Sequence, residues 1–468
     1  MSQHLDRRQF LQTAAAGTVA GGLLSPLGTK PGWAKYAARL DQPVIGCIGL
    51  GTRWNSIGPA AMKFGPCAAL CDVDKTHLEK AAKKTAGVLK KEGHQAKQLN
   101  LYEDYHAILD RDDINVVVIG TPDHWHTKMA VDALAAGKHV YCEKPLTLTM
   151  EEGQLIRQAL KKSGKTFQVG TQQRSTDLFI KAIALVQDGR IGELKKITCA
   201  IGAAPTSPSL PVASVPQPLN WDQWLGQAPM VKYREGGYPD SGYGKQFKFG
   251  RAHAHFRWWY EYSGGRMTDW GAHHVDIALL AAGKLGQDAG KVQFTTELVK
   301  HPVPFKDGMP TKDDQFNTAT DFHVIAKYDD GLEVHIRHNA DDLGFENGIM
   351  FEGTKGRFFV NRGKLTGRAV EELKDNPLPS EALRLPEERN STVAHMANFI
   401  ECCRTGETPT SDAESHHRAL SICHVANISL RLEGRPLTWD TASETILGDE
   451  QASSFLSRKP RKGFEITV

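Results

Sequence analysis

The feature that most constrains the fold is a regular alternation of strand and helix signals between residues 42 and 170. Short apolar runs typical of buried strands are separated by stretches with helical spacing. The predicted strands are 44–48, 68–71, 114–120, 139–142 and 166–170, and the predicted helices are 59–64, 75–89, 126–136 and 150–162. Strands that alternate with helices in this way form a parallel, doubly wound sheet.

A glycine turn and an acid follow the first two predicted strands, at the edge where such sheets bind ligands. The turn Gly49–Leu50–Gly51, with Thr52 and Arg53 after it, allows backbone N–H groups to approach a pyrophosphate. Asp72 ends the next strand, where a carboxylate can bind ribose hydroxyls and repel a 2′-phosphate. The pattern predicts a nucleotide site and favours NAD over NADP, although Arg53 and Lys75 lie nearby. The alternative is a plain strand–turn–helix unit without a ligand.

One residue departs from the dinucleotide-binding pattern. Trp54 stands where a third glycine is usual, which predicts that the helix begins later and packs less closely. As part of the turn, Trp54 is still a candidate to contact the cofactor.

Two further strand ends carry polar residues that could border a ligand. Thr121, Pro122 and His126 follow the most apolar strand, and His126 either contacts the cofactor or serves as a helix-entry residue. Glu143 and Lys144 follow the next strand, before a proline that favours an extended conformation for Lys144. A lysine fixed at this edge can meet a ligand hydroxyl; the alternative is a surface lysine before a turn.

The pattern changes after residue 171. Alternating runs at 320–328, 333–338, 348–352 and 356–361 predict antiparallel strands, and two helices, 391–404 and 412–433, follow. A Pro/Ser-rich loop at 204–218 is long for a compact domain, and such loops are often functional. The chain is therefore expected to hold a second α/β domain over residues 171–440, with a tail at 441–468. The closing helices are candidates to pack back on the first domain.

Acids, histidines and aromatic residues crowd the region from 253 to 276. A helix after Gly265 would place Asp269 and His273 one turn apart, so that the carboxylate orients the imidazole as a general acid–base. The alternative is a helix-end acid beside a packed histidine. Five rings here and just before this region either belong to the core or stack on a carbohydrate: Trp221, Trp224, Trp258, Trp259 and Tyr260.

The same histidines raise the question of a metal. His253, His255, His273 and His274 with Asp269 offer ligand atoms, but their spacing matches no tight ligand pattern, so no metal is predicted.

Residues 1–34 are predicted to form a targeting segment. Arg7–Arg8–Gln9–Phe10–Leu11 and the Ala/Gly-rich run after it resemble a twin-arginine signal, which implies export of the folded chain to the periplasm or another extracytoplasmic space. A disordered basic tail is the alternative. No later stretch reaches the roughly 18 apolar residues of a membrane span.

Charge and cysteine content narrow the function classes. The net charge of +3 is too small to steer the chain toward nucleic acid or an anionic membrane. The eight cysteines form no CxxC pair, so buried thiols are expected and no disulfide is predicted.

Several motifs in order resemble the glucose–fructose oxidoreductase/inositol dehydrogenase (Gfo/Idh/MocA) family. They are Gly49–Leu50–Gly51, Thr121–Pro122, Glu143–Lys144–Pro145, 169–174 with Gln172 and Arg174, Trp221-x-x-Trp224–Leu225–Gly226, Gly264–Gly265…Asp269-x-x-x-His273-x-x-Asp276 and Leu437-x-Trp439–Asp440. The resemblance runs from about residue 42 to 440.

This resemblance implies a Rossmann NAD(P)-binding domain at 42–170, a second domain with a large, mostly antiparallel open sheet, and assembly as a dimer or tetramer. It also implies hydride transfer at a sugar or polyol carbon. Lys144 resembles the family's lysine, which bonds the reacting hydroxyl, and Asp269 and His273 resemble its acid–base pair. Gln172, Arg174 and His274 become candidates for substrate binding, with the aromatic residues 258–260.

Three functions remain open at this point. The first is an exported oxidoreductase whose NAD is held tightly, because no free NAD pool exists outside the cytoplasm. The second is a redox-assisted glycosidase or lyase, like the exported α-N-acetylgalactosaminidases that resemble this family. The third is a sugar-binding protein that keeps the fold without the chemistry.

Overall fold

The computed structural model describes residues 43–94, 98–242, 244–286, 289–383 and 385–468. The predicted targeting segment at 1–34 lies outside these residues. The chain from Leu40 to Val468 forms one unit, whose described residues contain two large sheets and a separate two-stranded pair. Within the described residues, no helix is both long enough and apolar enough to cross a membrane. All eight cysteines belong to this part of the chain and are buried with free thiols.

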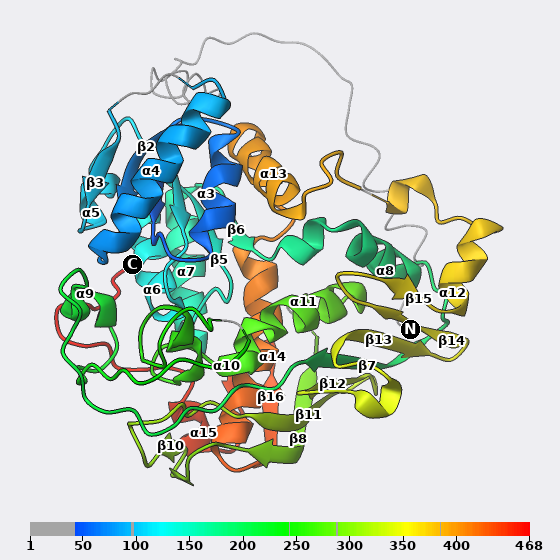
Figure 1. Ribbon diagram of the computed structural model, residues 1–468. Helices are drawn as coiled ribbons and strands as arrows, with labels where there is room; N and C mark the ends of the chain where they lie inside the picture. The colour runs from blue at the N-terminus through cyan, green and yellow to red at the C-terminus, as the bar shows by residue number, and fades with distance from the viewer. Residues whose placement is uncertain (1–42, 95–97, 243, 287–288, 384) are drawn as a thin grey trace, which may run out of the picture. The chain divides into compact units, whose positions relative to one another are not determined.

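The first sheet contains six parallel strands in the order β3-β2-β1-β4-β5-β6 (Figure 1). The strands are β1 (Ile45–Ile48), β2 (Cys67–Cys71), β3 (Asn100–Tyr102), β4 (Val116–Ile119), β5 (His139–Glu143) and β6 (Phe167–Gly170). The order reverses between β1 and β4, and ligands bind in the crevice at such a reversal. The prediction of a parallel, doubly wound sheet is confirmed. Strand β3 was not predicted because it is short and only partly buried.

Helices connect these strands. They are α3 (Trp54–Met62), α4 (Lys75–Lys91), α5 (His106–Leu109), α6 (Asp123–Ala135) and α7 (Met150–Ser163). The prediction of a late start for the first helix was wrong, because α3 begins at Trp54 itself. Gly58, one turn later, makes room for the indole: a Cβ at Gly58 would lie 2.4 Å from the Trp54 ring.

The second sheet contains nine strands in the order β15-β14-β13-β7-β12-β11-β8-β16-β17, and only β7 and β12 pair in parallel. The strands are β7 (Leu194–Ile201), β8 (Lys291–Lys300), β11 (Asp321–Tyr328), β12 (Glu333–Arg337), β13 (Asn347–Gly353), β14 (Gly356–Val360), β15 (Leu365–Thr366), β16 (Leu437–Asp440) and β17 (Thr445–Ile446). The short pair β9 (Phe305–Lys306) and β10 (Met309–Pro310) stands apart. The expected mostly antiparallel second sheet is confirmed.

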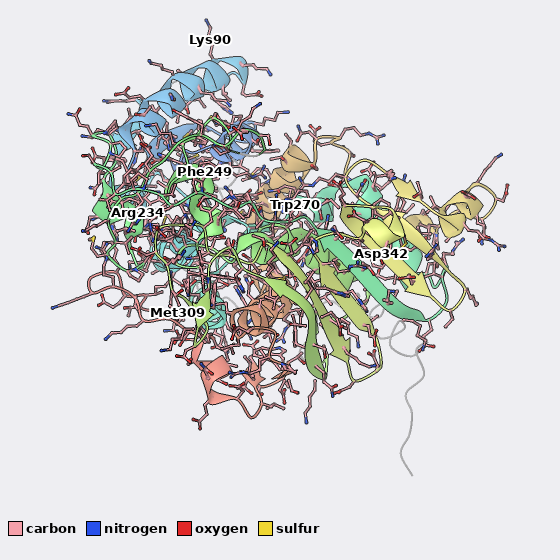
Figure 2. All side chains as sticks on the ribbon, turned by 60° about the horizontal axis from the view of Figure 1, so that its bottom comes forward. Lys90, Arg234, Phe249, Trp270, Met309 and Asp342 are labelled. Atoms are coloured by element: carbon pink, nitrogen blue, oxygen red, sulfur yellow. The ribbon has the colours of Figure 1, made fainter. Side chains whose placement is uncertain are left out.

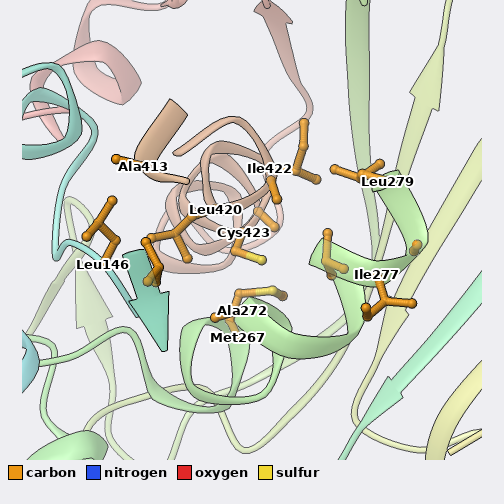
Figure 3. Close-up of a cluster of buried hydrophobic side chains, with 14 of the residues drawn as sticks. Leu146, Met267, Ala272, Ile277, Leu279, Ala413, Leu420, Ile422 and Cys423 are labelled. Atoms are coloured by element: carbon orange, nitrogen blue, oxygen red, sulfur yellow. The ribbon is translucent and has the colours of Figure 1, made fainter. Parts of the chain in front are cut away.

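The helices of the second part pack between the two sheets and on the larger one. They are α8 (Asp177–Gln187), α9 (Trp221–Leu225), α10 (Gly265–Asp269), α11 (Gly271–Ala281), α12 (Arg368–Glu371), α13 (Ser391–Thr405), α14 (Ala413–Arg431) and α15 (Glu450–Ser454). Figure 3 shows apolar side chains of α14 meeting those of α10 and α11. Gly271 allows this approach, since a Cβ there would lie 2.9 Å from the Cys423 sulfur. These contacts fix α10 and α11, which carry Asp269 and His273.

Helix α13 packs against α3 and the 3₁₀ turn Gln172–Ser175. Its apolar side chains, including Met396 and Phe399, belong to the same buried cluster as Trp54 and Tyr141 of the first domain. The last part of the chain thus supports the nucleotide-binding half of the fold.

Residues 204–258, which we call the cover segment, run from the second domain across the first (green in Figure 1). Leu219 pairs with Asp74, and the backbone N–H of Asn220 donates to Val73 over 2.9 Å. The C-terminal residues hold this segment from outside: Arg461 donates from Nε to the Gly226 carbonyl over 2.9 Å. The residues expected to form a tail are therefore in contact with both parts of the fold.

Candidate functional site

A cavity of about 740 Å³ opens at the carboxyl edge of the six-stranded sheet, between that sheet, the cover segment and α10–α11. Its wall includes these predicted site residues: Gly49, Gly51, Thr52, Arg53, Asp72, Thr121, Pro122, Glu143, Lys144, Gln172, Trp258, Asp269 and His273. The structure thus brings residues from the ends of the parallel strands and residues of the 253–276 region together in one cavity.

The glycine turn after β1 lies so close to the loop after β4 that it has no room for a side chain at Gly49. Gly49 has φ of +80°, and a Cβ there would lie 2.6 Å from Thr121, so a side chain is excluded. The carboxylate of Asp72 accepts the Leu50 N–H over 2.6 Å and the Asp74 N–H over 2.8 Å. Asp72 therefore fixes the turn while it faces the cavity.

Glu143 and Arg53 join two strand ends. The Arg53 guanidinium lies 2.9 Å from the Glu143 carboxylate, which also accepts from the Gln172 amide over 2.9 Å. Gly170 makes this arrangement possible, because a Cβ there would lie 2.5 Å from that carboxylate.

Lys144 and Asp269 meet although they are far apart in sequence. The Lys144 Nζ donates to the Asp269 carboxylate over 2.7 Å and to the Asp269 backbone carbonyl over 2.8 Å. Burial alone would raise the pKa of Asp269, but Lys144, Arg257 and Arg266 hold that pKa below its usual range. Asp269 is therefore an anion that holds the lysine at the cavity wall.

His273 lies beside this pair but is not oriented by it. The helix breaks after Asp269, α11 begins at Gly271, and the Asp269 carboxylate points to Lys144. The expected Asp269–His273 hydrogen bond is thus absent from the described residues, and the His273 Nδ1 is buried without a partner there. Burial and the nearby charges of Lys144 and Arg362 lower the pKa of His273 well below its usual value. The imidazole is neutral over the physiological range.

Two residues predicted to bind the cofactor stand behind the cavity wall instead. His126 has its ring nitrogens 2.7 Å from the Pro145 carbonyl and 3.0 Å from the Thr121 carbonyl. It links the loops after β4 and β5, because α6 begins earlier than predicted and carries the ring inward. Trp54 is buried under the start of α3.

Four residues predicted to bind substrate also lie outside the lining. Arg174 donates to Asp276 from Nε over 2.7 Å and from an NH₂ group over 2.6 Å, and both side chains are almost fully buried. His274 lies 3.0 Å from the Asn347 amide oxygen, on the far side of α11 from the cavity. Trp259 packs under Arg251, and the hydroxyl of Tyr260 accepts the Ala319 N–H. These side chains make contacts inside the protein instead of lining the cavity. Successive residues of a chain point in different directions, so a neighbour of a lining residue need not face the cavity.

Several residues of the cavity wall were not predicted. The cover segment supplies Phe247 and Arg257, next to the candidate ring of Trp224. The helix α10 supplies Arg266, and the turn between β14 and β15 supplies Arg362. Trp270, labelled in Figure 2, lies at the junction of α10 and α11. The length of the 204–218 loop was the one sequence signal that pointed to the cover segment, and no pattern pointed to Arg362.

The alternative metal set does not converge. The His255 ring bonds the Lys248 carbonyl, and His274 lies behind His273. Across the described ranges, the side chains close enough to share an ion are Asp74, His77 and His253, which lie near Asp72.

Comparison with known proteins gives the same picture. A family model described as "Oxidoreductase family, NAD-binding Rossmann fold" matches residues 44–171, and its C-terminal alpha/beta domain matches residues 205–466.

Two curated relatives share part of the chain. An α-N-acetylgalactosaminidase of Shewanella oneidensis is 29% identical over 208 residues, 41% of this chain and 44% of that protein. A levoglucosan dehydrogenase of Pseudarthrobacter phenanthrenivorans is 34% identical over 154 residues, 32% of this chain and 38% of that protein. Each match thus spans less than half of the relative's length.

A solved structure, the aldose–aldose oxidoreductase of Caulobacter crescentus, shares the fold with a TM-score of 0.55. It is 18% identical to this chain and is aligned over 84% of this chain and 99% of its own. Because the family models match both domains, this chain belongs to the Gfo/Idh/MocA family of oxidoreductases.

Proposed function

We propose that this protein is an exported, NAD-dependent oxidoreductase that moves a hydride to or from a secondary hydroxyl carbon of a sugar or sugar derivative. One observation carries the proposal: Lys144, Asp269 and His273 converge in the cavity that begins at the glycine turn. An amine, a carboxylate and a neutral imidazole at one place supply what proton transfer from a hydroxyl requires.

The residues present fit a dinucleotide. Gly49 and Gly51 offer a backbone without side chains at the start of α3, where a pyrophosphate is favoured. Asp72, Asp74 and Glu103 line the end of the cavity beyond the turn, and their charges disfavour the 2′-phosphate of NADP. Two nearby cations could have attracted a 2′-phosphate, but each is paired with an acid. Arg53 pairs with Glu143, and Lys75 pairs with Glu103. This supports NAD over NADP.

A bound NAD, held at the glycine turn and Asp72, would supply the acceptor for the hydride of the substrate carbon. The protein's task is to hold the hydroxyl and to take its proton. Lys144, held by Asp269, can donate a hydrogen bond to the hydroxyl oxygen and stabilise the negative charge that develops there. His273 is neutral and lines the cavity, so its imidazole can accept the proton as the C–O bond becomes a carbonyl.

The pKa of His273 sets a pH dependence. Because the folded-state pKa lies below its usual value of about 6.5, the neutral imidazole persists as the pH falls through that value. We therefore expect the acid limb of the kcat/KM profile to fall below the usual histidine pKa of about 6.5 and to disappear in His273→Gln. A limb at or above pH about 6.5, or one that His273→Gln retains, would argue against this base.

The cover segment supports a tightly held cofactor. Pro218 and Asn220 form backbone hydrogen bonds with the loop after β2. Arg461 donates hydrogen bonds to Gly226 and Asp222 of the cover segment. A nucleotide below would leave only after these contacts open. This agrees with the predicted export of a folded chain, which could carry its NAD with it.

Mass spectrometry of the nucleotide released from denatured native protein tests this. We expect NAD at close to one equivalent in the purified protein, and a lower occupancy in Arg461→Gln, which weakens the hydrogen bonds to the cover segment. Lys462→Gln, at an exposed neighbouring position, is the matched control and should keep full occupancy. A protein that carries no nucleotide and is not stabilised by added NAD would contradict the proposal.

The similarity to an α-N-acetylgalactosaminidase supports a second candidate, a redox-assisted glycosidase or lyase. In that chemistry the cofactor is reduced and reoxidised in each turnover. Release of a sugar or aglycone from a glycoside without net NADH would select it over net oxidation.

Assembly as a homodimer or homotetramer is also proposed. Residues of β11 and β12 alternate between buried and half-exposed, so one face of the large sheet is covered by helices and the other is open. The open face is a suitable surface for a second copy.

A further inference from the structure

The end of the cavity around Asp269 carries more positive than negative charge. Its basic side chains are Lys144, Arg257, Arg266 and Arg362, and its carboxylates are Asp123 and Asp269. Glu143 is already paired with Arg53. Asp269 alone lies 2.7 Å from Lys144, 3.8 Å from Arg257 and 3.9 Å from Arg266. A neutral sugar would leave this imbalance uncompensated.

Arg362 is held in place but not neutralised. Its guanidinium lies over the Trp270 ring, 4.5 Å from the centroid. With the Gln173 amide in the orientation that satisfies both of its ends, that amide donates to the His273 carbonyl and accepts from the Arg362 Nε over 3.2 Å. Within the described residues, the terminal NH₂ groups of Arg362 make no hydrogen bond or ion pair. They are left to face the cavity.

Arg266 is held in a similar way. Its Nε donates to the Ala203 carbonyl over 2.9 Å, and its guanidinium lies 5.2 Å from the centroid of Trp258. Its one acidic neighbour is Asp269, which is bonded more closely to Lys144. Both arginines are thus anchored through Nε and an indole ring. Such anchoring leaves the planar end of the guanidinium for a ligand.

We propose that the substrate carries a carboxylate, as in a uronic or aldonic acid, and that Arg362 and Arg266 bind it. This inference rests on the proposed function and names its substrate class. Two fixed guanidinium groups match a planar carboxylate, which accepts parallel N–H bonds in pairs. Lys144 stays with the reacting hydroxyl, so recognition and chemistry use different cations. The arginines neutralise the acid group, while Asp269 holds Lys144 for the hydroxyl.

Paired sugars that differ only in charge provide the test. Calorimetric titration of the NAD-loaded protein with glucuronate and glucose, and with galacturonate and galactose, measures affinity without turnover. We expect the acid of at least one pair to bind about 10-fold or more tightly than its neutral partner, and less tightly as salt is added. Arg362→Gln should bring that ratio close to one.

Arg357→Gln is the matched control, since Arg357 lies on β14, the strand that leads into the turn of Arg362, with an exposed side chain and only a 4.0 Å approach to Glu352. It should leave the ratio unchanged. Equal affinities, no binding of either acid, a preference for the corresponding hexose phosphates, or a ratio that Arg362→Gln leaves intact would each overturn the inference. Oxidation of neutral sugars alone would overturn it while leaving the oxidoreductase proposal in place. Binding of the acids with no change in the nicotinamide absorbance would instead count against the oxidoreductase proposal.

Discussion

Lys144→Met should lower kcat/KM for the sugar substrate by about 10²- to 10⁴-fold, because a positioned proton donor or acceptor contributes on this order. The Nζ of Lys144 is the one cation bonded directly to Asp269 at 2.7 Å, and it faces the reacting end of the cavity. The bound nucleotide should remain, since the glycine turn and Asp72 are untouched. Steady-state kinetics and mass spectrometry of the released cofactor measure the two effects separately.

Two companion variants make this result specific. Lys161→Met, on the exposed side of α7, should keep full activity. Lys144→Arg keeps the charge but replaces a compact ammonium with a wider, planar group that cannot keep the same position between Asp269 and the hydroxyl, so it should restore little turnover. Full turnover in Lys144→Met would remove Lys144 from the chemistry. Sugar binding without turnover in the wild type would instead favour the third function, a sugar-binding protein that keeps the fold alone.

The first domain could be predicted from sequence because its signals are local. Buried parallel strands appear as continuous apolar runs, and the residues that follow each strand must meet at one edge. Gly49, Asp72, Thr121 and Lys144 were placed in one cavity by that rule alone. The start of α3 was misjudged because the rule asks for a glycine at residue 54, whereas here the glycine that makes room is Gly58.

The site's substrate end was harder to predict because it depends on tertiary packing. The spacing of Asp269 and His273 correctly indicated nearby side chains, but not that the helix breaks between them or that Lys144 takes the carboxylate. Arg362 comes from a turn of the large sheet, some 90 residues after His273, and no periodicity marks it. Such residues become visible only when the sheet and the first domain are placed together.

Arg174 shows the opposite error, in which a charged residue beside a motif was taken for a ligand. Because Arg174 pairs with Asp276 in the protein interior, we expect a large loss of stability when this pair is broken. Asp276→Ala should lower the free energy of unfolding by about 3–5 kcal/mol, because it leaves a buried guanidinium without its partner. Thermal or urea unfolding of the NAD-loaded protein measures this. Asp342→Ala removes a similar bidentate pair with Arg337 at the surface and should cost no more than about 1 kcal/mol.

The pair also contributes a pH dependence with a fixed sign. Burial alone would raise the pKa of Asp276, but Arg174 and His416 lower it to about 2. A depressed carboxyl pKa stabilises the fold above the unfolded value of about 3.9, and this stability is lost as the pH falls toward 2. The slope of stability against pH between these values should therefore be smaller in Asp276→Ala than in the wild type.

The double variant Arg174→Met with Asp276→Leu separates a structural role from substrate binding. Replacing both charges with apolar side chains removes the unpaired guanidinium, so most of the lost stability should return. If Arg174 only supports α11 from behind, the double variant should also keep a KM close to that of the wild type. A KM raised 10-fold or more in a stably folded double variant would return Arg174 to the substrate site. A loss in Asp276→Ala no larger than that in Asp342→Ala would show that the buried pair is not what holds α11 in place.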